Sequence, residues 1–410
     1  MRKTIQLVYF LRFFGTGVII PVLSLMLLSR GATIETISLL VGFYSVTVIA
    51  AEFPSGVFAD VFGRRNAFLL SCVFSFVSYG ILLLSRSIPL LLCGMLLHGL
   101  SRAFASGSIE ALMIDQATTE HVPLERVTAR LSILESAGYA GGALTGGLLA
   151  DVGARFSGNL GANIIVAALL IVLTLLFVHE SPRERPQHAG KTHLELFRTQ
   201  IKESARFAKQ RGIVRILLVL CLLMGFVLSV IEIYWQPALA PYQSTYWIFG
   251  AVSSGAFAFV ILGSWLAEKL LRRYQNAGLG LLLLLKLPLG IGLIVFSMTA
   301  SEFSIIGVYL ALYLLIGSGG VVENTYLNRL APAESRASIL SLFSLVLQIG
   351  GVCASLVGYL VSANAAFQKV WLLAGVGLLI FIIVTAFLKK RAEMPAVAVS
   401  PEPDAARQDA

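Results

Sequence analysis

Residues 56–65 read GVFADVFGRR, and this short polar stretch lies between two apolar runs, residues 36–54 and 66–85. A helix needs about 20 apolar residues to cross a bilayer, so each run is long enough for one crossing. The stretch between the runs holds one acid, two arginines and two glycines, which is typical of a tight turn in water between membrane helices.

Ten further apolar runs extend this pattern in both directions along the chain. They lie near residues 5–28, 88–111, 131–150, 158–178, 213–236, 244–267, 276–299, 303–327, 337–361 and 367–388. Of the 410 residues, 57% are hydrophobic and 13% are charged, whereas soluble domains have about 25% charged residues. Helices are expected rather than barrel strands because the runs are long and continuous. The sequence therefore predicts an all-α membrane protein with twelve transmembrane helices.

The basic residues indicate how the chain is oriented. If the N-terminus is cytoplasmic, the cytoplasmic segments hold 24 of the 31 Lys and Arg residues and the outer loops hold 4. Such asymmetry predicts cytoplasmic termini in a cell inner membrane. The net charge of +9 is then attributed to the inner membrane face and not to nucleic-acid binding. The N-terminal apolar run is too long for a signal peptide and is expected to be the first helix.

The two halves of the chain are similar to each other. Residues 266–273, LAEKLLRR, follow the pattern of residues 58–65, FADVFGRR, with an acid four residues before an Arg pair. The predicted organisation is a six-helix bundle, a cytoplasmic linker, a second six-helix bundle and a tail. The four segments are residues 1–180, 181–212, 213–390 and 391–410. The linker is expected to form a basic amphipathic helix on the inner membrane surface, and the Ala-, Pro- and Asp-rich tail is expected to be disordered.

The twelve helices, the six-plus-six repeat and the GVFADVFGRR turn together resemble the major facilitator superfamily. The signature of that family is Gly, three residues, Asp, a basic residue, any residue, Gly and two basic residues, and only Val61 departs from it. The resemblance implies a fold of two pseudo-symmetric six-helix bundles. It also implies that the turn Asp faces the N-terminus of helix 11, where an anion gains about 0.3–1 kcal/mol, and that the neighbouring Arg pairs with an acid on helix 4. The predicted gating residues are Gly56, Asp60, Gly63, Arg64, Arg65 and Asp115, with Glu268 and Arg272 in the second half.

Residues 138–147, GYAGGALTGG, resemble the glycine-rich antiporter motif of exporters in this superfamily. The resemblance is incomplete at Ala143, where Pro is typical, and at Ala129, before this stretch, where Gly is typical. The alternative is close helix packing by small residues. His98-Gly99 lies where such exporters often have Gln-Gly, but the Arg expected four residues before the Gly is Met95 here.

Ionisable residues inside the apolar runs are the candidates for substrate and proton binding, because a charge at a helix centre costs about 2.5–3.5 kcal/mol. The candidates are Arg12, Arg102, Glu135, Glu232 and Glu323, together with His98 and Asn324. The resemblance implies that helices 1, 4, 7 and 10 line a central cavity, which would include the two arginines, Glu232 and Glu323. Two structural alternatives stay open: an ion pair between Arg12 and Glu135, and neutralisation of Lys286 by one of the C-terminal glutamates.

Glu232 and Glu323 are the predicted proton- or cation-binding acids, because a carboxyl group in low dielectric can bind and release protons near neutral pH. Both lie in the C-terminal half, whereas Arg12 and Arg102 lie in the N-terminal half. In this arrangement a cationic solute and a proton compete for the acids, while the other wall of the cavity stays positive.

No enzyme is expected. The chain has no phosphate-cradling loop, its five histidines lack metal-ligand spacing, and its four cysteines lie in apolar runs, so no cofactor or metal is predicted. The predicted function is a monomeric, proton-coupled exporter of a small amphiphilic solute or drug that works by alternating access. One alternative is a proton symporter that imports a polar nutrient such as a sugar or organic acid, because residues 180–183, ESPR, resemble a sugar-porter signature. The other is a non-transporting membrane receptor or assembly protein with the same fold.

Overall fold

The computed structural model describes residues 3–106, 108–119, 124–179, 212–243, 245–273, 278–330, 336–362 and 366–393, and the regular elements in these ranges are all helices. The first half contains α1 (Lys3–Ile19), η1 (Ile20–Val22), α2 (Leu23–Ser29), α3 (Ile34–Phe62), α4 (Arg64–Leu84), α5 (Ile88–Ala105), α6 (Ser108–Thr119), α7 (Leu124–Leu149), η2 (Ala154–Phe156) and α8 (Ser157–Phe177). The second half contains α10 (Gly212–Leu239), η3 (Ala240–Tyr242), α11 (Trp247–Arg273), α12 (Leu279–Ser297), α13 (Glu302–Leu330), α14 (Arg336–Val361) and α15 (Gln368–Glu393).

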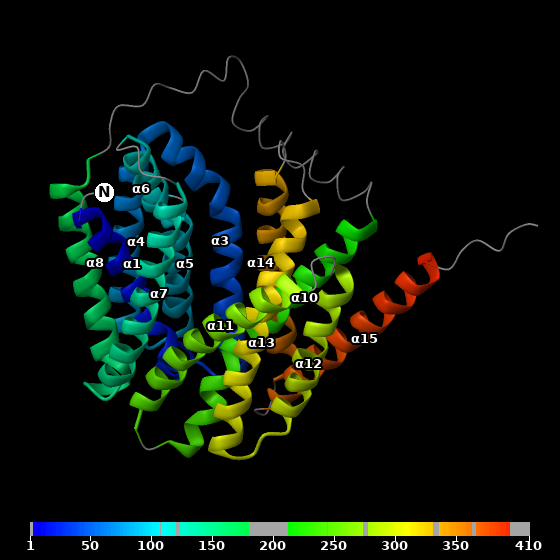
Figure 1. Ribbon diagram of the computed structural model, residues 1–410. Helices are drawn as coiled ribbons and strands as arrows, with labels where there is room; N and C mark the ends of the chain where they lie inside the picture. Colours follow the sequence, from blue (N-terminus) through cyan, green and yellow to red (C-terminus); the bar gives the residue numbers. More distant parts are fainter. Residues whose placement is uncertain are drawn as a thin grey trace, which may run out of the picture.

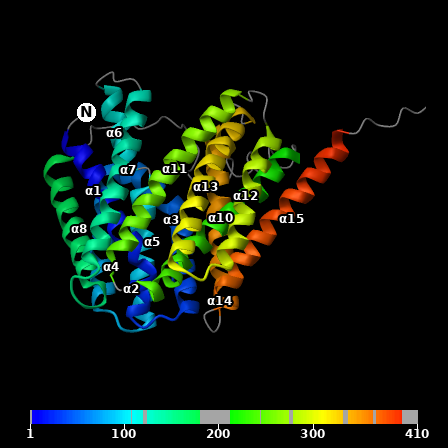
Figure 2. The same ribbon diagram turned by 60° about the horizontal axis from the view of Figure 1, so that its bottom comes forward.

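The helices form two bundles that lie side by side. Figure 1 shows α1 to α8 on the left and α10 to α15 mostly on the right, and Figure 2 shows the same division after rotation. The chain starts α1 and ends α8 at the top of Figure 1, which we call the termini end. The turn between α2 and α3 lies at the other end, called here the opposite end. The predicted fold of two six-helix bundles is confirmed.

Eleven helical segments of the described chain are long and apolar enough to cross a membrane. The twelfth predicted run, residues 131–150, lies in α7, which is 26 residues long but rich in glycine, serine and threonine. The glycines allow close packing between helices: a Cβ added at Gly138 would lie 2.9 Å from the Phe10 carbonyl oxygen of α1. The length of α7 and its place inside the bundle make it the fifth crossing.

Some helices differ from the runs expected from hydropathy. The second run was expected to end near residue 54, but α3 continues through Pro54 to Phe62 and stops at Gly63. The helix continues into the more polar residues after the apolar run, and hydropathy alone does not predict this part of a helix. Conversely, the fourth run is divided, because α5 ends at Ala105 and α6 starts at Ser108.

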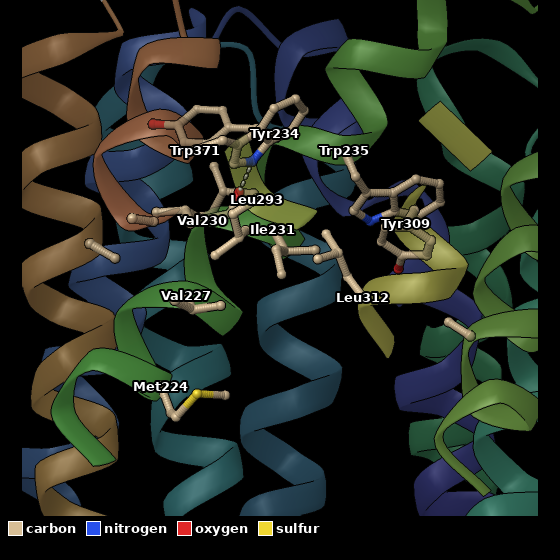
Figure 3. Packing of buried hydrophobic residues seen from close by; sticks show 14 of the residues in the cluster. Met224, Val227, Val230, Ile231, Tyr234, Trp235, Leu293, Tyr309, Leu312 and Trp371 are labelled. Carbon is tan, nitrogen blue, oxygen red and sulfur yellow. Dashed lines mark hydrogen bonds between the residues drawn. The ribbon is translucent and has the colours of Figure 1, made fainter. Parts of the chain in front are cut away.

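Large side chains at the centre of the second bundle fix the position of α10. Trp235, Trp371 and Tyr234 are almost fully buried (Figure 3). The Trp371 indole of α15 donates a hydrogen bond of 2.9 Å to the Val230 carbonyl oxygen of α10 and stacks on Phe296 of α12 at 3.9 Å. Because these aromatic contacts bury large areas, α10 packs firmly against α15, which in turn packs against α12.

The bundles are joined by buried hydrogen bonds near the opposite end. The Ser24 amide donates to Gln236 Oε1 at 2.9 Å, and Gln236 Nε2 donates to the Ile20 carbonyl oxygen at 2.7 Å. Nearby, the Ser38 and Tyr234 hydroxyl groups are 2.5 Å apart. A buried polar group without a partner costs about 1–3 kcal/mol, so these mutual bonds hold this end closed.

The helices α7 and α11 also cross in close contact between the bundles. A Cβ added at Gly250 would lie 2.9 Å from Gly147 Cα and 2.5 Å from the Ala143 carbonyl oxygen. The Ser254 hydroxyl donates to the Ala140 carbonyl oxygen at 3.0 Å. The glycines of the GYAGGALTGG stretch thus serve close packing, which was the alternative to an exporter motif.

Candidate functional site

A central cavity of about 430 Å³ lies between the two bundles. Helices α1, α3, α5 and α7 of the first bundle and α10, α11 and α13 of the second contribute to its wall. The polar and aromatic lining residues are Thr16, Tyr44, His98, Arg102, Tyr139, Glu232, Ser253, Phe257, Tyr309 and Tyr313. A concave site of this volume, apolar with a few convergent polar groups, is typical of small-molecule binding.

Two side chains of opposite charge line the cavity from different bundles. Arg102 of α5 is exposed and lines the cavity from the first bundle. Its hydrogen-bonding neighbour is the Tyr139 hydroxyl, and in the described part of the chain no carboxylate lies within ion-pair distance of its guanidinium. Glu232 of α10 lines the cavity from the second bundle and likewise has no basic partner among the described residues.

The carboxylate of Glu232 is held by an aromatic neighbour. The Tyr309 hydroxyl of α13 is its hydrogen-bonding partner. Tyr309 in turn stacks on Trp235 (Figure 3), and their ring centres are 4.6 Å apart. Since both rings are buried, the hydroxyl is fixed in place, and Glu232 lies in a mostly apolar wall.

Aromatic rings form the other walls of the cavity. His98 lies between Tyr44, with ring centres 5.1 Å apart and 28° between planes, and Tyr79, at 5.5 Å. His98 Nδ1 is buried and has no hydrogen-bond partner. From opposite bundles, Tyr139 and Phe257 stack at 5.4 Å with 12° between their planes. Aromatic rings in the wall favour a solute with an aromatic or other apolar body.

A second cavity of about 240 Å³ shares Tyr44 and Arg102 with the first. It is also lined by Ser229 and Gln348. Gln348 of α14 donates to the Glu52 carboxylate of α3 at 3.0 Å, which is a hydrogen bond between the two bundles. A buried polar network thus joins the bundles at the opposite end, and the exposed Gln348–Glu52 bond joins them toward the termini end.

Of the predicted binding residues, Glu232, Arg102 and His98 lie in the cavity wall, but Arg12 and Glu135 do not. Arg12 Nη1 donates to the Thr16 hydroxyl at 2.7 Å on the same helix. The alternative of an ion pair between Arg12 and Glu135 is wrong for this structure, because neither has an ion-pair partner within the described residues. The Thr16 hydroxyl, one turn along α1, satisfies the guanidinium instead.

Glu323 forms an ion pair with Lys286 at 3.0 Å, which was the structural alternative for this residue. The Lys286 side chain is 1% exposed and that of Glu323 is 16% exposed, so the pair lies between α12 and α13 and not in the central cavity. Asn324, next along α13, is exposed and does not line the cavity either. A proton-binding role for Glu323 therefore competes with neutralisation of Lys286.

The predicted gating residues lie at the termini end. Gly63 forms the turn between α3 and α4 with φ of +93°, a conformation that favours glycine. Arg65 donates to the Leu175 carbonyl oxygen at 2.9 Å at the end of α8. Asp60 is exposed and Arg64 is partly exposed, whereas the side chain of Asp115 lies outside the described residues. The latch among these three stays a prediction.

The remaining gating residues show no cross-bundle contact in the described chain. Glu268 and Arg272 form an exposed ion pair one turn apart within α11. A Cβ added at Gly56 would meet nothing within 4 Å. Exposed pairs of this kind contribute about 0–1 kcal/mol, so the pair does not by itself hold the bundles together.

Sequence reasoning missed the aromatic and amide residues of the site. Tyr139 and Tyr309 are the hydrogen-bonding neighbours of the two charges, and Gln236 and Gln348 join the bundles. The available signal was an uncharged polar or amphipathic side chain within an apolar run. Such residues are less costly in a membrane than charges, so they draw less attention in a search for ionisable groups.

The chain belongs to the Major Facilitator Superfamily, whose family model matches residues 5–323. The match agrees with the fold, the central cavity and the Gly63 turn. The protein is thus a multi-pass membrane transporter and not an enzyme.

Its relatives include proteins named for drug resistance. The chain is 26% identical to Multidrug resistance protein 1 of Bacillus subtilis over 184 residues, covering 45% of this chain and 47% of the relative. It is 24% identical to Quinolone resistance protein NorA of Staphylococcus aureus over 216 residues, covering 49% and 54%. These matches span about half the length of the two relatives. Over 383 residues it is 22% identical to the uncharacterized MFS-type transporter YxaM of Bacillus subtilis, covering 93% and 94%.

Solved structures share the fold at low identity. The nucleoside transporter NupG aligns with a TM-score of 0.77 and 14% identity, covering 94% of this chain and 98% of that one. A bacterial homologue of the human lysosomal transporter Spinster, in an inward-facing and unoccupied conformation, aligns with a TM-score of 0.73 and 17% identity, covering 95% and 96%. Both likenesses concern the fold alone.

Proposed function

We propose that this protein is a proton-coupled exporter that moves a small amphiphilic solute across the cell inner membrane by alternating access. The observation that carries the proposal is the half-buried Glu232 side chain in the wall of an aromatic cavity between two bundles. A carboxyl in such surroundings holds either a proton or a polar group of the solute. The two are then exchanged at one site.

The contacts between the bundles supply the alternating access in this proposal. The Ser24–Gln236 and Ser38–Tyr234 bonds close the opposite end, and the Gln348–Glu52 bond lies toward the termini end. Opening to the opposite end breaks the first set and brings α3 and α14 closer at the termini end. Asp60, Arg64 and Asp115 then form the latch predicted from the sequence.

The direction of transport is proposed from two features. The cavity wall is largely aromatic, which suits an amphiphilic solute better than a sugar. Two relatives that match about half of their length are named for resistance to drugs. The proposal includes cytoplasmic termini, in line with the distribution of Lys and Arg, and a monomeric state.

The proposed function is tested by measuring proton release in detergent. Addition of a transported solute, selected from a panel by efflux from proteoliposomes, is expected to release protons from the parent protein and not from Glu232→Gln. Glu302→Gln, at the start of α13 and outside the cavity, is the matched control and should release protons like the parent.

Other outcomes identify the alternatives. Proton uptake with the solute would instead indicate a symporter. Unchanged release in Glu232→Gln would place the proton site elsewhere, with Glu323, Glu135 and Glu110 as the next candidates. No solute-dependent transport or proton exchange over the whole panel would favour the receptor or assembly protein.

A further inference from the structure

We propose that Phe156 is a latch that closes the opposite end of the protein, and that Arg30 is the positioning residue that holds it there. The inference rests on the alternating access of the proposed function and adds residues that close one end. Phe156 lies in the short helix η2 between α7 and α8 of the first bundle, and its ring packs against Tyr246, which precedes α11 of the second. Neither residue lines the central cavity.

The backbone that carries the Phe156 ring has an unfavourable conformation. Arg155 has φ of +56° and ψ of +42°, and Phe156 has φ of +58° and ψ of +31°. In this left-handed conformation the Cβ of an L-residue crowds the following carbonyl oxygen, and the other described residues with positive φ are glycines. Two such residues in succession persist only where the surrounding structure holds them. Contacts of this state must therefore compensate the strain of the turn.

The side chain of Arg30 supplies one set of these contacts. Its Nη2 donates a hydrogen bond of 3.0 Å to the Arg155 carbonyl oxygen, and its Nη1 donates to the carbonyl oxygens of Leu83 at 2.6 Å and Ser85 at 3.5 Å. Arg30 is 4% exposed, and in the described chain no carboxylate lies within ion-pair distance of it. A buried cation is costly unless its donors are satisfied, and carbonyl groups at the C-terminus of α4 carry the negative end of the helix dipole. Arg30 therefore fixes the turn to α4 by charge-assisted hydrogen bonds.

The second bundle supplies a packed surface for the Phe156 ring. The Phe156 and Tyr246 rings meet edge to face, with centres 5.0 Å apart and 66° between their planes. The Tyr246 ring lies 6.0 Å from that of Phe249, which lies 5.7 Å from that of Trp235. Phe156 is 5% exposed and belongs to the same buried apolar cluster as Phe249 and Trp235. Edge-to-face contacts between buried rings are favourable, so this contact stabilises the state in which the bundles meet at this end.

Strain and contact act in opposite directions on this turn. When the bundles separate at the opposite end, Phe156 loses the Tyr246 ring, and the left-handed turn can relax. The ring contact favours the closed state, Arg30 favours the turn that presents the ring, and the strain favours opening. Such a balance suits a transporter, because each turnover must pass through both states.

The experiment is double electron–electron resonance on the full chain in detergent, without solute. Spin labels are attached to Ser87→Cys and Ser301→Cys in a cysteine-free background, both exposed at the opposite end on different bundles. Phe156→Ala removes the ring, and Arg30→Gln removes the charge-assisted bonds. Each is expected to lower the ratio of closed to open molecules at least about tenfold. Arg30→Lys keeps the charge but not the planar fork of donors, so it should lie between the parent and Arg30→Gln.

Two further variants separate the latch from other effects. Arg155→Gly keeps the carbonyl oxygen that Arg30 binds and removes the cost of the left-handed conformation, so its closed fraction should equal or exceed that of the parent. Lys369→Gln, exposed near the start of α15, is the matched control for loss of a cation and should give the distances of the parent.

Distances like those of the parent in either Phe156→Ala or Arg30→Gln overturn the inference, even where the melting temperature falls, because the contacts would then stabilise only the first bundle. An equal shift in Lys369→Gln also overturns it. If Arg30→Gln does not fold, Arg30→Lys takes its place with a smaller shift. Failure of the proposed function is seen separately: normal proton release in Glu232→Gln would move the proton site and leave the latch in place.

Discussion

The crossing of α7 and α11 predicts that one added methyl group at Gly250 changes which end of the protein is open. The Cβ of Gly250→Ala would lie 2.5 Å from the Ala143 carbonyl oxygen, where ordinary contacts begin at 3.4 Å. Because the neighbour is backbone and not a flexible side chain, the bundles must separate there by about 0.9 Å or bear strain.

The size of the effect follows from this strain. Inserting a methyl group into a well-packed contact costs about 1–3 kcal/mol. The contact joins two bundles that separate when the opposite end opens, so the cost falls on the closed state and not on the fold of either bundle. The ratio of closed to open molecules is therefore expected to fall about 5- to 150-fold.

The assay is double electron–electron resonance between spin labels attached to Ser87→Cys and Ser301→Cys in a cysteine-free background. Both positions are exposed at the opposite end, on different bundles. Gly250→Ala should populate longer distances than the parent. Gly307→Ala is the matched control, because its added Cβ meets nothing within 4 Å. An unchanged distance distribution in Gly250→Ala, with a parent-like melting temperature, would refute the reasoning.

A substitution at Gly146 serves to distinguish strain within the first bundle from strain between the two bundles. The Cβ of Gly146→Ala would meet the Val18 backbone of α1 inside the first bundle. This variant should lower the melting temperature in detergent and leave the label distances of the folded fraction unchanged.

Three further predictions concern other parts of the molecule. Lys286→Met should lower the free energy of unfolding in detergent by about 3–5 kcal/mol, because it leaves the Glu323 carboxylate without its ionic partner. Adding Glu323→Leu should restore most of the loss. Equal melting temperatures of the parent and the single variant would contradict the buried pair. Asp60→Asn should strongly reduce transport in proteoliposomes with normal membrane insertion, and a normal rate would remove the latch hypothesis. In a cysteine-free background, a membrane-impermeant thiol reagent should label Ser87→Cys but not Arg272→Cys in intact cells; the reverse pattern would invert the topology.

The sequence by itself determined the class of protein and its division into two bundles. Long apolar runs separated by short charged turns predict membrane helices, because a backbone in lipid must satisfy its own hydrogen bonds. The tight turn within residues 56–65 was also predicted from its glycines. The structure agrees, because Gly63 adopts a positive φ. Burial cost selected Glu232 and Arg102, which line the cavity, but it equally selected Arg12, Glu135 and Glu323, which do not.

Only the tertiary structure decided which ionisable groups meet. Glu232 and Glu323 look alike in the sequence, but one lies in the central cavity and the other pairs with Lys286 between α12 and α13. Hydropathy gives the depth of a residue along its helix and not the direction its side chain takes around the helix, which is set by packing against neighbouring helices. For the same reason, only the structure shows that the glycines of α7 allow close packing against α1 and α11.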